Sequence, residues 1–260
     1  MGRLRPCFVR TQTWQHAVRY VSALVSEMPK RNGWTIAQHA WDRSPDRTQR
    51  LLNLASWDAL GAMSQVRRFA AAGLEEAARR SRRRGGLVIG AIDETGQEKA
   101  GKTAGVKRQY MGCAGRVANG INTVDLSCVR EKTGHALAGA RQWIPAEHIE
   151  DPVTSLVTGL PLDLGFRTKG QLAIDICADC CADGVRSDFI CGDEVYGGCT
   201  LLREFLEAER QAYVLRVASS FMITLPGGTK LTCAEAVKRL VKDKRRWEIR
   251  SAGKGSKSRP

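Results

Sequence analysis

The chain has 260 residues, and its 41 Lys and Arg against 27 Asp and Glu give a formal net charge of +14. This length allows one large domain or two modest ones, and 43% hydrophobic residues are enough for a buried core. No apolar run approaches the roughly 18 residues that cross a bilayer, and residues 1–10 lack a signal peptide's apolar segment, which excludes membrane and secreted proteins. We expect a cytoplasmic, nucleoid-associated protein that binds a polyanion, most commonly nucleic acid.

Residues 1–84 form the first predicted region, and it is helical. Apolar residues recur at steps of three and four over residues 14–28, which predicts an amphipathic helix that ends before Gly33. A long helix over residues 56–84 closes the region, and its end carries an arginine cluster at residues 79–84.

Two short helices, at residues 34–41 and 46–54, lie between these longer ones. Ser44-Pro45 provides a cap and a proline at the start of the second helix. If the pair forms a helix-turn-helix, Arg47 and Arg50 lie on its exposed face as DNA contacts. An ordinary helical bundle is the alternative.

From residue 85 onward the spacing of apolar residues changes from that of helices, and residues 85–218 are predicted to contain a sheet. The apolar run at residues 87–92 is bounded by glycines, as buried strands are. Further strands are expected at residues 119–129, 136–144, 188–192 and 212–217, and helices at residues 169–182 and 201–210. The fold class is therefore α+β or α/β, a mixed sheet with flanking helices. Residues 219–260 are predicted to be irregular and strongly basic.

Nine cysteines, an odd number, argue against a disulfide framework in a cytosolic protein. Cys177, Cys180 and Cys181 have a spacing like that of zinc ligands, but they share one face of a predicted helix with apolar residues. A thiol in that position acts as a small hydrophobic group. We therefore expect structural cysteines.

Residues 96–103 match the phosphate-loop pattern GxxxxGKT and raise the alternative of nucleotide binding through Lys102. A phosphate loop leads directly into a helix whose N-terminus faces the phosphates. Glycines interrupt the residues that follow, and Asp93 and Glu94 place carboxylates just before the loop. Nucleotide binding stays a less favoured alternative.

Two aspartates, Asp93 and Asp193, come at the ends of predicted strands, in Asp-Glu pairs of similar surroundings. Successive side chains of a strand face opposite ways, so one acid of each pair can point into a shared site. Two converging carboxylates repel unless a cation such as Mg²⁺ or Mn²⁺ joins them. Two such ions about 3.5–4 Å apart would support in-line phosphoryl displacement. The alternative is that both acids cap the helices that follow.

The chain resembles the DDE-superfamily transposases of bacterial insertion sequences. The residues that carry this likeness, in order, are 30–34, 45–52, 92–96, 106–110, 115–119, 134–137, 192–197 and 251–257. The resemblance implies a ribonuclease-H-like core in which two aspartates and one glutamate bind two Mg²⁺ ions. It also implies attack by water, and then by a DNA 3′-hydroxyl, on phosphodiester bonds at the element's ends. Asp93 and Asp193 correspond to the two aspartates.

The third acid of that family has no counterpart in this sequence. The family's glutamate lies on a helix beyond an insertion, and residues 251–257 resemble that insertion. Glutamates after Asp193 are either too near it or lack the family's surroundings; they are Glu204, Glu207, Glu209, Glu235 and Glu248. We expect a C-terminally truncated copy with a partial core at 85–218, an interrupted insertion at 219–260, and DNA binding better than cleavage.

Basic residues that follow the first aspartate are candidate phosphate contacts, and they are Lys99, Lys102, Lys107 and Arg108. The alternative is a solvated hairpin loop. A DNA-binding regulator without catalysis remains a second functional hypothesis. A homodimer is left open.

Overall fold

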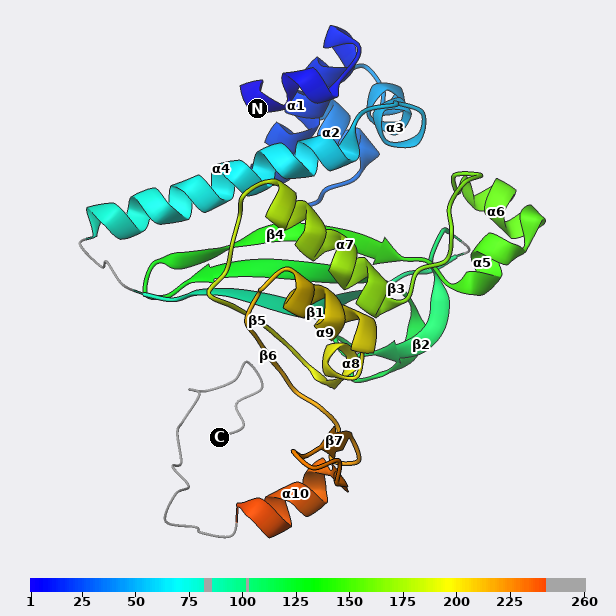
Figure 1. Ribbon diagram of the computed structural model, residues 1–260. Coiled ribbons are helices and arrows are strands. Elements are labelled where there is room, and N and C mark those ends of the chain that lie inside the picture. The colour runs from blue at the N-terminus through cyan, green and yellow to red at the C-terminus, as the bar shows by residue number, and fades with distance from the viewer. Residues whose placement is uncertain (82–85, 102, 242–260) are drawn as a thin grey trace.

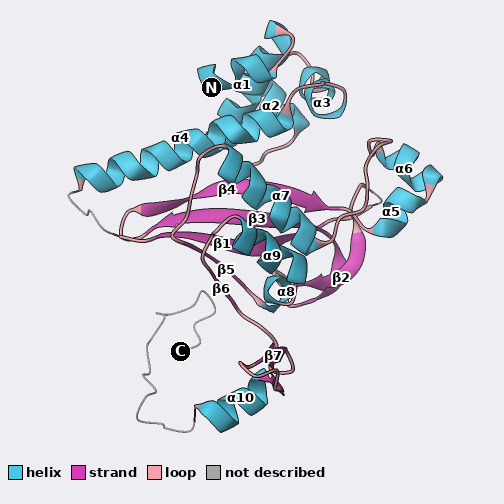
Figure 2. Ribbon diagram, viewed as in Figure 1, coloured by secondary structure: helices cyan, strands magenta, loops and turns pink. Residues whose placement is uncertain are grey.

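The computed structural model describes residues 1–81, 86–101 and 103–241, and it stacks a helical N-terminal part against a six-stranded sheet (Figures 1 and 2). The N-terminal part consists of the 3-10 helix η1 (Gly2–Cys7) and helices α1 (Thr11–Val25), α2 (Gly33–His39), α3 (Asp46–Asn53) and α4 (Ala59–Arg80). The predicted helices are therefore present. The last arginines predicted for the long helix lie outside the described residues.

Local capping explains where these helices begin. The Asn32 side chain accepts a hydrogen bond from the Thr35 amide at the start of α2, and Asp58 accepts one from the Gly61 amide at the start of α4. The prediction for α3 is wrong in detail. Pro45 stands at the cap position itself, while the Ser44 hydroxyl donates to the Asp46 side chain and accepts from the Asp46 amide at 3.4 Å.

The sheet is mixed, as predicted. Its strands are β1 (Val88–Glu98), β2 (Lys107–Met111), β3 (Arg116–Arg130), β4 (Gly134–Trp143), β5 (Phe189–Gly192) and β6 (Tyr213–Leu215). Strand β3 pairs antiparallel with β1 along one edge and with β2 and β4 along the other, while β1, β5 and β6 are parallel neighbours. An antiparallel meander continued by parallel strands is the expected ribonuclease-H-like arrangement.

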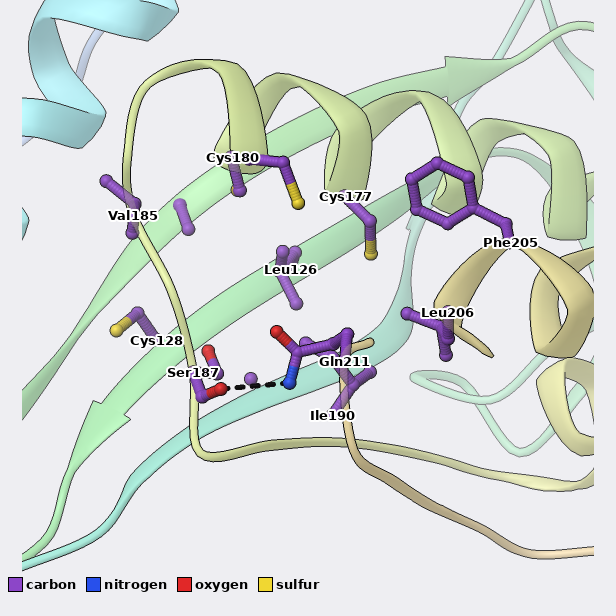
Figure 3. A pocket seen from close by; sticks show the side chains of 13 residues that line it. Leu126, Cys128, Cys177, Cys180, Val185, Ser187, Ile190, Phe205, Leu206 and Gln211 are labelled. Carbon is purple, nitrogen blue, oxygen red and sulfur yellow. Dashed lines mark hydrogen bonds between the residues drawn. The ribbon is translucent and has the colours of Figure 1, made fainter. Parts of the chain in front are cut away.

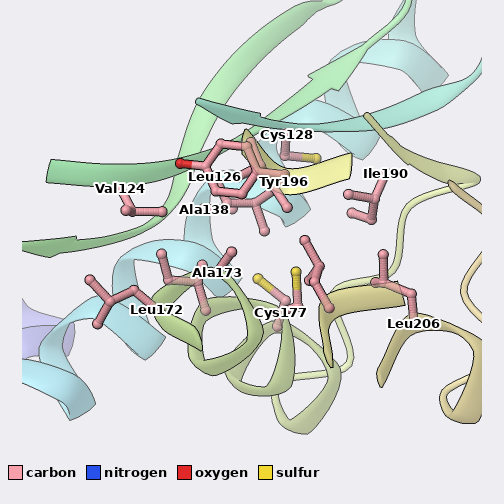
Figure 4. Packing of buried hydrophobic residues seen from close by; sticks show 14 residues of the cluster. Val124, Leu126, Cys128, Ala138, Leu172, Ala173, Cys177, Ile190, Tyr196 and Leu206 are labelled. Carbon is pink, nitrogen blue, oxygen red and sulfur yellow. The ribbon is translucent and has the colours of Figure 1, made fainter. Parts of the chain in front are cut away.

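Helices α7 (Lys169–Ala182), α8 (Glu194–Gly197) and α9 (Thr200–Ala208) lie over one face of this sheet, the core face (Figure 1). The buried hydrophobic cluster joins alternate strand residues such as Ile92, Val124 and Leu126 to Ile176 and Leu206 of the helices (Figure 4). Alternation of burial along β3 therefore follows the period of two that a one-sided sheet requires.

The other face of the sheet, called here the open face, carries exposed or half-buried side chains. On β1 and just beyond it these are Asp93, Thr95, Gln97 and Lys99, and on β3 they are Asn119, Ile121, Thr123 and Asp125. The same register puts Arg108 and Tyr110 of β2 on this face, because Arg108 pairs with Asn119 and Tyr110 with Val117.

Two of the three cysteines of α7, Cys177 and Cys180, face the core, whereas Cys181 is half-buried and accepts a hydrogen bond from Arg186. Cys177 and Cys180 are buried beside a cavity of about 20 Å³, where Gln211 donates to the Ser187 carbonyl (Figure 3). Burial raises the pKa of Cys177 to about 12 and that of Cys180 to about 11. Such thiols are protonated at neutral pH, which agrees with the predicted structural role.

One buried arginine attaches α4 to the core. Arg67 is 2% exposed, donates from Nε to the Ala138 carbonyl at 2.6 Å, and pairs with Asp183 and, at 3.5 Å, with Asp179. A buried charge is tolerated only when it is paired and hydrogen-bonded, as here. The contact joins the N-terminal helical part to α7 and β4.

The remaining elements lie outside this sheet. Helices α5 (Ala146–Glu150) and α6 (Pro152–Thr158) follow β4, and β7 (Met222–Thr224), β8 (Lys230–Thr232) and α10 (Cys233–Leu240) follow β6. The expectation of an irregular segment after residue 219 is therefore wrong up to residue 241, because β7 and β8 pair and Thr232 caps α10. No described helix is both long and apolar enough to cross a membrane.

Candidate functional site

The two predicted aspartates follow paired residues of neighbouring parallel strands. Ile92 of β1 is in register with Gly192 of β5, so Asp93 and Asp193 are the next residue of each strand's path. Both side chains are exposed. The two strands are thus neighbours, which is the condition for the two acids to converge, and Asp93 and Asp193 come to one edge of the β1–β5 pair.

The local roles of the two aspartates differ. Asp193 caps α8 by accepting from the Val195 amide at 2.9 Å, as the alternative interpretation proposed. Asp93 does not end its strand, because β1 continues to Glu98 in full register with β3. Among the described residues, its carboxylate accepts only the next amide, that of Glu94, at 2.8 Å. The Asp93 side chain therefore projects from the middle of a strand and not from its end.

A third carboxylate, which the sequence analysis missed, lies beside Asp93. Asp125 of β3 is its cross-strand partner on the open face and is half-buried. Burial raises the pKa of Asp125, a hydrogen bond from Thr95 opposes this effect, and the charge of Asp93 adds to it. The sequence does contain a signal for this acid. Asp125 lies between the apolar residues Val124 and Leu126, and this alternation predicts that its side chain faces away from the core.

Glu94, the neighbour of Asp93, faces the core and is held by two side chains. Lys169, at the start of α7, donates from Nζ to Glu94 Oε2 at 2.5 Å, and the Tyr196 hydroxyl donates to Oε1 at 3.4 Å. The Lys169 ammonium also lies 5.7 Å from the centre of the Trp143 ring. This network joins the strand that carries Asp93 to the helix that Asp193 caps.

Tyr196 lies close to several of the acids described above. The residue is completely buried. Its pKa is raised chiefly by burial, and further by the charges of Glu94, Asp193 and Asp93. The phenol therefore stays protonated and can serve as a donor to the carboxylates.

The chemistry of the donor set fits a hard divalent cation. Mg²⁺ keeps several waters and is commonly bound through one or two carboxylates plus substrate phosphates. Asp93 and Asp193 can supply that number of carboxylates, with exposed oxygens. Within the described ranges, no three His, Cys, Asp or Glu residues are grouped so that they could hold a metal ion.

Three of the glutamates that the sequence offered after Asp193 interact with other residues, and Glu204 is exposed on α9. Glu207 accepts from the Tyr213 hydroxyl at 2.6 Å, Glu209 lies 3.7 Å from Arg186, and Glu235 caps α10. Glu248 lies outside the described residues. No third acid from this part of the chain joins Asp93 and Asp193 in the described structure.

A phosphate loop requires a helix directly after it, but the residues after the GxxxxGKT match form strand β2. Gly96 lies inside β1, Gly101 has a φ of +93° in the turn that follows, and residues 107–111 form β2. A strand presents no row of free amides to a phosphate as a helix N-terminus does. Lys102 itself lies outside the described residues.

The predicted DNA contacts of the hairpin fall into two groups. Lys99 and Arg108 are exposed on the open face. Lys107 instead faces the core side, where its Nζ lies 2.5 Å from Glu147 Oε1 and 6.0 Å from the Trp143 ring centre. Its charge is therefore already neutralised.

The predicted contacts of the N-terminal part line a hollow between α1 and α3. Arg47 and Arg50 border this cavity of about 400 Å³ together with Arg10 and His16. Arg47 pairs with Asp42 at 2.8 Å. The hollow thus gathers basic side chains from two helices.

The comparison with protein families agrees with the sequence resemblance. A family model described as DDE superfamily endonuclease matches residues 3–233. The crystal structure of the Mos1 mariner paired end complex with Mn is 12% identical, with a TM-score of 0.26, over 74% of this chain and 56% of that one. The Mos1 transposase paired-end complex with left transposon end is 13% identical, with a TM-score of 0.24, over 77% and 58%. The chain spans less than two thirds of either protein, and no curated protein matches it.

Proposed function

The chain belongs to the DDE superfamily endonucleases, and from this premise we propose that it is a DNA transposase that uses divalent metal to cleave and join DNA strands. The observation that carries the proposal is the register of β1 with β5, which brings Asp93 and Asp193 to one edge. Two exposed carboxylates at that edge suit Mg²⁺ or Mn²⁺. The DNA would be that of insertion-sequence ends.

In this proposal the chain's own groups hold and orient the reacting parts. Asp93 and Asp193 would hold the cation, and a cation bound there would supply stabilisation of the charge that develops on the phosphodiester oxygens. Lys169 and Tyr196 fix Glu94, and with it the segment of β1 that presents Asp93. The α8 amide bonded to Asp193 restricts that carboxylate in the same way.

A second candidate is a DNA-binding protein that does not cleave. The observation that favours it is that no three His, Cys, Asp or Glu side chains, Asp93 and Asp193 included, are grouped within the described residues so that they could hold a metal ion. Both candidates share the basic surfaces and differ only in whether the metal site is complete enough for chemistry.

Metal binding tests the site. Titration with Mn²⁺, followed by calorimetry, is expected to show binding to the wild type that Asp93→Asn and Asp193→Asn each weaken at least about tenfold, because each removes a charged ligand. Asp163→Asn, at an exposed loop residue, is the matched control and should bind as the wild type does. Equal Mn²⁺ affinity in all four proteins would contradict the assignment.

Cleavage separates the two candidates. For supercoiled plasmid incubated with Mg²⁺ or Mn²⁺, the transposase candidate predicts nicked circles with the wild type but none with Asp93→Asn. Binding to the same plasmid without nicking, by a wild type that binds Mn²⁺, would favour the non-cleaving candidate.

A further inference from the structure

The cations of the β2–β3 hairpin are divided between the two faces of the sheet. On the core side, Lys107 lies 2.5 Å from Glu147, and Arg116 lies 3.1 Å from Glu98. The hydrogen bond from Lys107 lowers the pKa of Glu147, as expected for a close pair. These two cations are neutralised within the protein.

On the open face of the same hairpin, the cations have different surroundings. Lys99 and Arg108 are exposed, and neither forms an ion pair with an acid in the described part of the chain. They belong to the face that carries Asp93, because Asn119 pairs with Arg108 and its carbonyl accepts from the Lys99 amide. The unneutralised charge thus lies on the side of the acidic edge.

An exposed aromatic side chain completes this surface. Tyr110, two residues after Arg108 on β2, is 66% exposed, and its cross-strand partner Val117 is 52% exposed. Tyr110 takes no part in the buried clusters of the described structure. Aromatic rings beside cations are the features on which single-stranded nucleic acid stacks.

The register also sets the distances along the surface. Six residues separate Asp93 from Lys99, about 20 Å at the usual 3.3 Å per strand residue. One strand of DNA advances about 3.4 Å per nucleotide, so this path corresponds to about six nucleotides. Arg108 and then Tyr110 continue in the same direction across β3.

We propose that DNA runs along the open face from Asp93 to the hairpin, with Lys99 and Arg108 on its phosphates and Tyr110 stacked on an unpaired base. The inference rests on the proposed function for its ligand, DNA, but not on cleavage. A protein partner would instead need acidic groups opposite these cations and is the competing outcome of the test below.

Salt dependence tests the phosphate contacts. The probe is a mixed-sequence duplex with a 3′ single-stranded overhang, bound without divalent metal at several salt concentrations. Lys99→Gln and Arg108→Gln are each expected to make the slope of log K against log salt shallower by about 0.7–0.9, the value for one lost phosphate contact. Lys107→Gln and Arg116→Gln, the core-side controls, should keep the wild-type slope. Equal slopes for all four variants would overturn the proposal.

Stacking is tested by Tyr110→Ala and Tyr110→Phe. The alanine variant is expected to bind the overhang DNA about tenfold more weakly with an unchanged salt slope, while phenylalanine, which keeps the ring, restores binding to within about twofold. Blunt duplex should respond little to either change. Thermal melting of the free proteins controls for folding.

A positional readout distinguishes this inference from the proposed function. Photocross-linking of overhang DNA with bromodeoxyuridine is expected to label the peptide that contains Tyr110. Wild-type protein that binds DNA but cross-links only elsewhere, with hairpin variants that bind normally, would overturn this inference and leave the proposed function standing. Wild-type protein that binds no DNA would overturn both, and capture of an acidic protein by the hairpin would replace the DNA assignment here.

Discussion

Single residues in this protein take their roles from the face of the sheet that they occupy. Asp93 and Glu94 are adjacent carboxylates, yet one is exposed and the other is bonded to Lys169 and Tyr196. The period of two makes this division unavoidable in a strand. A substitution at either position therefore tests a different property: cation binding at Asp93, and the rigidity of the site at Glu94.

Asp125 gives a prediction about pH. Its raised pKa means that the folded protein holds the proton more tightly than the unfolded chain does. Below the unfolded pKa both states are protonated and no stability is lost. As pH rises through the interval between the two pKa values, the unfolded state ionises first, and the free energy of unfolding falls.

Asp125→Asn stays neutral at every pH and is expected to remove this fall. Relative to the wild type, the variant should gain stability between about pH 3 and neutral pH, measured by urea unfolding at both. Asp163→Asn should show no such gain. A variant whose stability relative to the wild type stays constant with pH would contradict the assigned burial effect.

At the scale of elements, the contacts between helices and sheet depend on a few close approaches. Arg67 joins α4 to the Ala138 carbonyl and to Asp183 of the turn after α7. Gly197, at the end of α8, packs so closely on β6 that an added Cβ would lie 1.9 Å from the Arg216 carbonyl oxygen. Both contacts are long-range, and neither follows from local periodicity.

Arg67→Met is expected to lower the free energy of unfolding by about 1–3 kcal/mol, because it leaves the buried Ala138 carbonyl without its donor and the half-buried Asp183 without its closest cation. Arg80→Met, which removes an exposed i,i+4 pair with Glu76, should cost no more than about 0.5 kcal/mol. Urea unfolding measures both. If both variants lost so little stability, the contacts of Arg67 would not be what attaches α4 to the core.

Gly197→Ala is expected to destabilise the protein by about 2 kcal/mol or more, since a backbone carbonyl must move to admit the methyl group. Gly73→Ala is expected to have the opposite effect on stability. Its added Cβ meets no atom within 4 Å in the middle of α4, so helix propensity should raise stability by about 0.5–1 kcal/mol. Thermal melting checks the two signs, and a stable Gly197→Ala protein would refute the close packing of α8.

For the whole molecule, the net charge of +14 and the proposed metal site predict separable properties. DNA affinity is expected to fall linearly on a log–log plot against salt, because each phosphate contact releases counterions. A chelator should leave this binding intact and abolish any cleavage. Binding that needs divalent metal but ignores salt would contradict the role given to the basic surfaces.

Much of the fold could be predicted from periodicity alone. Helices α1 and α7 and strands β3 and β4 occur where the sequence places them, because an apolar stripe or alternation indicates which face is buried. Strand β2 was missed, since Lys107–Met111 is short and largely polar and forms a strand only by pairing with β3. Residues 222–240 were missed for a similar reason: β7 and β8 are too short to show a period.

The sequence by itself determined the family, the paired Asp-Glu motifs, the buried role of the α7 cysteines and the excess of positive charge. Only the tertiary structure decided that Asp125 joins Asp93, that Lys107 is neutralised by Glu147, and that Lys99, Arg108 and Tyr110 share a face with Asp93. The physical reason is strand register. Residues far apart in the chain become neighbours on one face through hydrogen-bonded pairing, and local sequence does not specify that pairing.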